Sequence, residues 1–139
     1  MYPDFEAASI DGKPVTSLIQ DRAWLENDFI KRVQGRGAEI IKARGKSSAA
    51  SAASACLDHM KNLITTTPED DFFSAAVLTN GEWYGLPKGL VFSLPLRTKA
   101  GGHYEVVEGI NLSDFSREKI KISCDELLKE KELVADFLG

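Results

Sequence analysis

Cysteine and histidine are both scarce in this chain of 139 residues, which contains two of each. Cys56 and Cys124 stand far apart at apolar positions of predicted helices, so we interpret them as reduced thiols in the core. His59 and His103 have no spacing, to each other or to the cysteines, that is typical of metal ligands. The sequence therefore predicts no metal site.

Long hydrophobic runs and an excess of positive charge are also missing. No apolar run reaches the ~20 residues that a membrane-spanning helix needs, and residues 1–6 form neither a basic nor an apolar signal region. The formal net charge of -4 disfavours non-specific binding to nucleic acid or to anionic membranes. We therefore expect a cytoplasmic protein without a membrane or nucleic-acid partner.

The composition that remains is that of one ordinary globular domain, with 43% hydrophobic and 27% charged residues. The chain opens with two short extended segments joined by a turn at Asp11-Gly12-Lys13-Pro14. A helix then follows Asp21, a good N-cap, and ends before Gly45, a good C-cap. Gly35 and Gly37 weaken the middle of this helix.

A second helix is predicted over Ser47–Ile64, because apolar residues recur there at the spacing of one helix face. This face consists of Ala49, Ala53, Cys56, Leu57, Met60, Leu63 and Ile64. Its small side chains predict that the helix packs closely under other elements. Ser47 or Ser48 can cap its start, where Arg44 and Lys46 add positive charge, so we expect a helix end that suits an anion.

After the second helix the pattern changes from helical to extended. Runs rich in aromatic and β-branched residues at 72–79, 90–98 and 103–108 predict an antiparallel meander. Pro95 cannot donate a ladder hydrogen bond, so the second strand needs a bulge or an unpaired edge there. Ser113 is the expected N-cap of a long final helix. The apolar face of this helix consists of Ile120, Cys124, Leu127, Leu128, Val134, Phe137 and Leu138.

The order of these elements predicts the fold class. A strand pair comes first, followed by two helices, a three-stranded antiparallel meander and a long C-terminal helix. Sheet and helices are thus segregated along the chain, which is typical of an α+β fold.

The sequence contains one partial nucleotide-binding motif. Gly45-Lys46-Ser47 resembles the end of a P-loop, but Ile40 occupies the position of the required first glycine, and the preceding segment has a helical pattern. No Gly-x-Gly-x-x-Gly motif exists, which excludes a dinucleotide-binding fold from this chain. The residues themselves thus favour one site, a helix start with hydroxyls and no catalytic acid or base. It is formed by Gly37, Lys46, Ser47 and Ser48.

The histidines supply no catalytic set for this site. His59 and Asp58 are adjacent in the predicted second helix, where neighbouring side chains point about 100° apart, so they cannot face Ser47 together. His103 stands at the start of a predicted strand. We therefore expect both histidines to be structural or to face solvent.

Four segments stand out, in this order: GAEIIKARGKSSA at 37–49, YGLPKGLVFSLP at 84–95, DFSREK at 114–119 and ELLKEKE at 126–132. Together they resemble the carboxy-terminal half of cytosolic-type malate dehydrogenase, a member of the lactate/malate dehydrogenase family. Lactate dehydrogenases are similar in architecture, but they usually carry threonine followed by tryptophan where this chain has serines and alanines. The resemblance implies an oxidoreductase that interconverts malate and oxaloacetate with NAD.

The resemblance also implies roles for a few residues. Gly37, Ser47 and Ser48 are similar in position to residues that line the substrate side of the active site, and Ser51 to a residue near the nicotinamide. In the family, the dinucleotide fold and the substrate-clamping arginines precede this half, and the catalytic histidine lies just before the position of Tyr2. Neither histidine of this chain is therefore expected to be catalytic. The family is usually dimeric, and its alanine-rich helix contributes to the contact.

We therefore interpret residues 1–139 as the substrate-side domain of a malate dehydrogenase, with the amino-terminal dinucleotide-binding domain absent. Without a bound NAD and an acid–base group, this chain alone should bind no cofactor and should be inactive. The alternative is a non-catalytic module that self-associates or assembles with a partner through the surface that the missing domain would cover.

Overall fold

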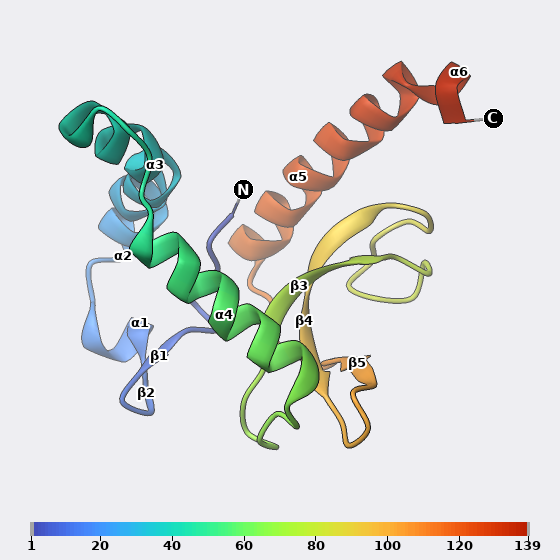
Figure 1. Ribbon diagram of the computed structural model, residues 1–139, viewed down its shortest axis with the longest axis horizontal. Helices are drawn as coiled ribbons and strands as arrows, with labels where there is room; N and C mark the ends of the chain where they lie inside the picture. The colour runs from blue at the N-terminus through green and yellow to red at the C-terminus, as the bar shows by residue number, and fades with distance from the viewer. Residues whose placement is uncertain (1, 139) are drawn as a thin grey trace.

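A three-stranded antiparallel sheet and the helices around it form the α+β fold that the sequence predicts (Figure 1). The computed structural model describes residues 2–138. Its strands are β1 (Ser9–Ile10), β2 (Lys13–Pro14), β3 (Phe73–Leu78), β4 (Val91–Thr98) and β5 (Tyr104–Val106). Its helices are α1 (Val15–Leu18), α2 (Arg22–Trp24), the π-helical turn η1 (Leu25–Phe29), α3 (Ile30–Arg44), α4 (Ala50–Ile64), α5 (Asp114–Leu133) and α6 (Ala135–Leu138).

The predicted opening turn is confirmed. β1 and β2 pair antiparallel, with Ile10 opposite Lys13. The two residues between the strands, Asp11 and Gly12, have φ angles of 51° and 73°. Positive φ at both central positions is the geometry of a type I′ turn, which suits a tight hairpin.

The first predicted helix is confirmed, together with both of its caps. Asp21 accepts a hydrogen bond from the Trp24 amide at 2.9 Å, and Gly45 ends α3 in the left-handed region with φ of 74°. The π-helical turn η1 was not predicted. In an α-helix, residues five apart point about 140° from each other, whereas the wider turn of a π-helix brings them closer to the same side. It lets Leu25 and Ile30 share one buried surface.

The second predicted helix starts later than expected, because α4 begins at Ala50 and its N-cap is Ala49, which makes no side-chain hydrogen bond. The predicted capping by Ser47 or Ser48 is therefore wrong. The physical reason lies in the connection itself. Gly45 turns the chain away from α3, and the Arg44 guanidinium donates to the Ser47 carbonyl at 2.9 Å. This contact holds the two serines outside the helix.

The predicted meander is confirmed, with strand order β3-β4-β5. Pro95 lies in the central strand opposite Ser74. Its carbonyl accepts from the Val107 amide at 2.9 Å, just past the end of β5 at Val106. The nitrogen of Pro95, which carries no hydrogen, thus faces the end of the β4–β5 ladder. No ladder hydrogen bond is needed from Pro95 at this position, which agrees with the unpaired edge predicted from the sequence.

The final helix begins as predicted but ends earlier. Ser113 caps α5 by accepting from the Ser116 amide at 3.1 Å. The helix stops at Leu133, and a short α6 follows Val134, so the predicted face does not continue unbroken to the end. The Phe137 side chain is 87% exposed. The side chain of Leu138, predicted on the same face, lies outside the described part of the chain.

Two hydrophobic cores support this arrangement. The sheet core consists of Phe73, Ala75, Leu86, Leu90, Leu94, Leu96 and Cys124. The helical core consists of Phe5, Val15, Leu25 and Ile30, with Tyr2, Ile19, Trp24, Phe29 and Phe115 packed against it. Helix α5 contributes to both, because its first turn carries Phe115 and its middle carries Cys124. It therefore joins the two cores.

The two cysteines have different environments. Cys124 is a buried thiol as predicted, and burial raises its pKa. Cys56 is exposed on α4, so the prediction that it belongs to the core is wrong. Within residues 2–138, no helix has the length and apolar character that crossing a membrane requires.

Candidate functional site

The predicted site residues lie along α3 and in the connection to α4. Ser47 and Ser48 lie in this connection, and Ser51 lies in the first turn of α4. Gly37 lies within α3, seven residues before Arg44. At this separation two helix residues share a face, about 10 Å apart along the axis. The structure thus groups the three serines at one end of α3 and places Gly37 two turns away. We call residues 44–51 the α3–α4 junction.

The α3–α4 junction is open to solvent. Ser47 and Ser51 are exposed and Ser48 is half-buried. A Cβ atom built on Gly37 would have no atom within 4 Å, so the space above it is also free. Since Ala49 provides no side-chain cap, the positive end of the α4 dipole remains available beside Lys46. The junction can attract an anion and offer it hydroxyls, but only from one side.

Helix α4, which extends from this junction, has no buried residue. Its apolar face, formed by Ala53, Cys56, Leu57, Met60, Leu63 and Ile64, is exposed throughout. The exposed fraction reaches 62% for Met60 and 77% for Ile64. The prediction that this helix packs under other elements is therefore wrong for this chain, because no described element covers that face.

The contacts of α4 with the sheet lie near its C-terminal end. The Thr98 hydroxyl donates to the Asn62 carbonyl at 2.6 Å, and Thr98 and Thr67 exchange two further hydrogen bonds of 2.9 Å each. The His59 ring packs edge-on against Phe73, with ring centroids 6.1 Å apart. His59 therefore has a structural contact, while His103 is exposed, as the sequence predicts for the two histidines.

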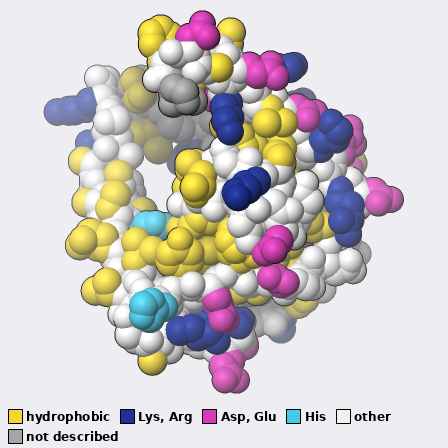
Figure 2. All heavy atoms as spheres, turned by 90° about the vertical axis from the view of Figure 1, so that its right-hand side faces the viewer, with side chains coloured by type: hydrophobic (Ala, Val, Ile, Leu, Met, Phe, Trp, Pro, Cys, Tyr) yellow, Lys and Arg dark blue, Asp and Glu magenta, His cyan; other side chains and the backbone are white. Residues whose placement is uncertain are grey.

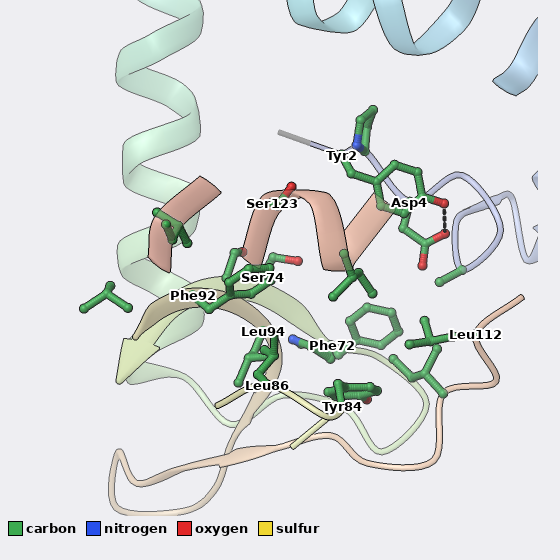
Figure 3. Close-up of a pocket in the computed structure, with 18 of the residues that line it drawn as sticks. Tyr2, Asp4, Phe72, Ser74, Tyr84, Leu86, Phe92, Leu94, Leu112 and Ser123 are labelled. Atoms are coloured by element: carbon green, nitrogen blue, oxygen red, sulfur yellow. Dashed lines mark hydrogen bonds between the residues drawn. The ribbon is translucent and has the colours of Figure 1, made fainter. Parts of the chain in front are cut away.

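A cavity of about 660 Å³ lies between the amino-terminal segment, the sheet and α5. Figure 3 shows Tyr2 and Asp4 on its upper side, with Phe92 and Leu94 of β4 below them. Figure 2 shows a band of hydrophobic side chains beside a hollow on this face of the molecule. Sequence reasoning missed this cavity. The alternating apolar residues of β4 mark its floor, but Tyr2 and Leu112, which help to close it, belong to segments without a periodic pattern.

The polar groups at the cavity favour hydrogen bonding over proton abstraction. Burial is the main reason why the pKa of Tyr2 is raised to about 12. Its hydroxyl therefore stays protonated near neutral pH, and it contacts Ser116 Oγ at 2.8 Å. The Tyr84 hydroxyl at the cavity is also engaged, because it donates to the Val107 carbonyl.

A dense polar cluster lies beside the cavity, centred on the half-buried Glu6. The Ser113 and Ser116 hydroxyls donate to its Oε2 at 2.5 Å and 2.6 Å. Arg22 Nη2 donates to its Oε1 at 2.7 Å. Burial acts to raise the pKa of Glu6, but the hydrogen bonds from the two serines and Arg22 outweigh it and lower the pKa below its usual value.

Other chemistries find no support in the described residues. Among residues 2–138, no three His, Cys, Asp or Glu side chains converge as a metal site would require. The P-loop alternative is contradicted, because Ile40 and Gly45 belong to α3 and its cap, where that motif requires a loop after a strand.

The sequence matches a known family over almost its whole length. A profile described as lactate/malate dehydrogenase, alpha/beta C-terminal domain, matches residues 1–138. Malate dehydrogenase of Magnetococcus marinus is 53% identical over 136 residues, which cover 98% of this chain and 41% of that protein. The chloroplastic NADP malate dehydrogenase of Flaveria bidentis is 50% identical over 99% of this chain and 30% of its own length.

Solved structures share the fold. The crystal structure of malate dehydrogenase from Naegleria fowleri has a TM-score of 0.84 and 41% identity, over 97% of this chain and 41% of that one. Trichomonas vaginalis lactate dehydrogenase, in complex with NADH and oxamate, has a TM-score of 0.80 and 32% identity, over 94% of this chain and 40% of that one. The chain thus spans less than half the length of these proteins.

Proposed function

The chain belongs to the lactate/malate dehydrogenase family, and from this premise we propose that it is the substrate-side domain of an NAD-dependent malate dehydrogenase of the cytosolic type. The main support is the identity of 53% to a protein named malate dehydrogenase over 98% of this chain. In the whole enzyme, the reaction would interconvert malate and oxaloacetate by hydride transfer. We propose a cytoplasmic location for it.

We further propose that a dinucleotide-binding domain precedes this domain in the whole enzyme. The matched relatives are more than twice as long as this chain, and the family profile describes a C-terminal domain. Two uncovered surfaces are suited to such a neighbour. One is the cavity beside Tyr2, and the other is the apolar face of α4, since exposed apolar surface of this kind marks an interface.

At the α3–α4 junction, we propose that Gly37, Ser47 and Ser48 line the substrate side of the active site. The hydroxyls and the uncapped start of α4 suit a dicarboxylate such as malate or oxaloacetate. The open space above Gly37 leaves room for the substrate or for the other domain. Because no acid–base group accompanies these residues, this chain alone should be inactive.

NAD would be the cofactor of the whole enzyme, where its nicotinamide gives or takes the hydride. Of this chain's residues, we propose only Ser51 near the nicotinamide, since its hydroxyl lies in the exposed first turn of α4. The residues present thus fit the edge of a dinucleotide site and not a complete one. One solved relative contains NADH and another relative is an NADP enzyme, so the preference for NAD needs a direct comparison of both cofactors.

The proposal can be tested on the protein captured from its natural source with an antibody against this chain. We expect a mass more than twice that of this chain, and oxidation of NADH that depends on oxaloacetate and exceeds the rate with NADPH. A captured protein of about 15.3 kDa without this activity would contradict the proposal.

The exposed apolar face of α4 favours a second candidate, self-association. In a whole enzyme, this face would form part of a homodimer contact. In the isolated chain, it would make the protein a non-catalytic assembly module. Sedimentation at high protein concentration shows whether the isolated chain associates or stays monomeric. A chain that stays monomeric would count against the module, and a Leu57→Glu variant should weaken any association that occurs.

A further inference from the structure

The carboxylate of Glu6 connects three elements that are distant in sequence. It lies in the amino-terminal segment and receives hydrogen bonds from Ser113 and Ser116 at the start of α5. It also pairs with Arg22 at the start of α2. The Glu6 side chain is 16% exposed, so water screens these interactions less than it screens a surface ion pair.

This cluster lies where the two cores meet. The first turn of α5 packs into the helical core through Phe115, whereas the middle of α5 packs into the sheet core through Cys124. Phe5, next to Glu6, contacts the Phe115 ring at a centroid distance of 6.1 Å. The position of the amino-terminal segment and that of the first turn of α5 are thus set together.

We propose that Glu6 is an electrostatic latch, whose ionised carboxylate holds the amino-terminal segment and the first turn of α5 against α2. Loss of its charge releases both segments together and leaves the sheet core closed. The latch acts through three donors at once. A carboxylate bound by charge-assisted hydrogen bonds is held more strongly than one in a neutral hydrogen bond.

Several charged groups surround the latch. On its own segment, Asp4 accepts from the Glu6 amide at 3.0 Å, and the Tyr2 hydroxyl contacts Ser116 Oγ at 2.8 Å. On the helical side, Arg22 also binds Glu26, at 2.6 Å. On α5, Lys119 Nζ lies 5.1 Å from the centre of the Phe115 ring. Because these neighbours also carry charge, a substitution isolates the latch most directly, and an acid titration tests it only if the Glu6 carboxyl itself is followed.

The test compares Glu6→Gln with Glu26→Gln in this chain. Both variants remove a carboxylate that binds Arg22, but only the first removes the negative charge to which the two serine hydroxyls donate. Hydrogen exchange is followed by NMR at the amides of Ser116 and Arg117, which bond to Ser113, and at the Thr79 amide beside the sheet.

We expect Glu6→Gln to speed exchange at Ser116 and Arg117 about tenfold or more, while exchange at Thr79 changes less than about twofold. Glu26→Gln should leave all three amides near their original rates. Unchanged exchange at Ser116 and Arg117 in Glu6→Gln would overturn the latch. An equal rise at Thr79 would also overturn it, because Glu6 would then support the whole fold rather than one contact.

If Glu6→Gln fails to fold, the unmodified chain still tests the latch. The carbon-13 shift of the Glu6 carboxyl and the exchange rates, corrected for their intrinsic pH dependence, are followed as the pH falls. The latch requires exchange at Ser116 and Arg117 to accelerate as Glu6 takes up its proton. Exchange that follows a different titration, or none, would overturn it.

Discussion

Replacement of Thr98 by valine tests how α4 is attached to the sheet. The Thr98 side chain is fully buried, and its hydroxyl donates to the Asn62 carbonyl at 2.6 Å. Asn62 lies in the last turn of α4, where carbonyls have no partner within the helix. Valine keeps the shape of threonine but removes this donor.

The expected loss of unfolding free energy is about 1–2 kcal/mol. A buried acceptor left without a donor costs about 1–3 kcal/mol. We take the lower part of this range, because Asn62 is an exposed residue and its contact with Thr98 is only part-buried. The two hydrogen bonds with Thr67 remain in the variant, because both use the Thr98 backbone: its amide donates to the Thr67 hydroxyl, and its carbonyl accepts from the Thr67 amide.

Urea unfolding measures this loss, and Thr66→Val provides the control. Thr66 is exposed in the same connection, so its replacement should change the unfolding free energy by less than about 0.5 kcal/mol. A loss below about 0.3 kcal/mol for Thr98→Val would refute the conclusion that this hydroxyl anchors α4. The slope of unfolding free energy against urea should be the same for both variants.

Three further changes test other parts of the fold. Leu96→Ala in the sheet core, where Leu96 is fully buried, should cost about 2–5 kcal/mol in urea unfolding, whereas Leu133→Ala at an 82% exposed position should cost less than about 0.5 kcal/mol. Gly45→Ala should cost about 1–2 kcal/mol in the same assay, because φ of 74° strains alanine while the space around it is free, and an unchanged midpoint would contradict the left-handed cap. The raised pKa of Tyr2, about 12, means that its neutral form stabilises the fold below pH 10 and that this stability is lost as the pH rises towards 12. Between pH 10 and pH 12, the urea midpoint should therefore fall less steeply with pH in Tyr2→Phe than in the original chain. Parallel plots of midpoint against pH for the two proteins would refute this contribution of Tyr2.

The sequence predicted those parts of the fold that depend on local chemistry. Asp21, Gly45 and Ser113 cap helices because their own side chains or backbones satisfy the helix ends nearby. The strands follow from runs of apolar and β-branched residues bounded by glycines. Pro95 also indicated where the ladder had to stop, since a missing N–H has the same consequence in any sheet.

The wrong predictions concern features that depend on contacts between residues distant in sequence, or on which element covers a given surface. The start of α4 depends on the contact from Arg44 to Ser47, which competes with capping by the serines. The spacing of apolar residues correctly predicts an apolar face on α4, but it does not say which element covers that face. The prediction that Cys56 lies in the core is wrong for this reason. The η1 turn and the Glu6 cluster bring together residues that no local rule connects.

The candidate site was predictable only in part. The charged, hydroxyl-rich α3–α4 junction follows from Arg44, Lys46, Ser47 and Ser48 as residue types. The cavity beside Tyr2 does not, because it is formed by the amino-terminal segment, β4 and α5. These elements meet only in the folded chain.

The central proposal, a substrate-side domain of malate dehydrogenase, is tested most directly by joining this chain to the amino-terminal portion of a matched relative. The amino-terminal portion of Magnetococcus marinus malate dehydrogenase, outside the 41% of that protein that this chain matches, is joined to this chain, and oxaloacetate-dependent oxidation of NADH is measured. We predict turnover well above the blank for the joined protein and none for this chain alone. A joined protein that binds NADH but does not turn over oxaloacetate would contradict the proposal.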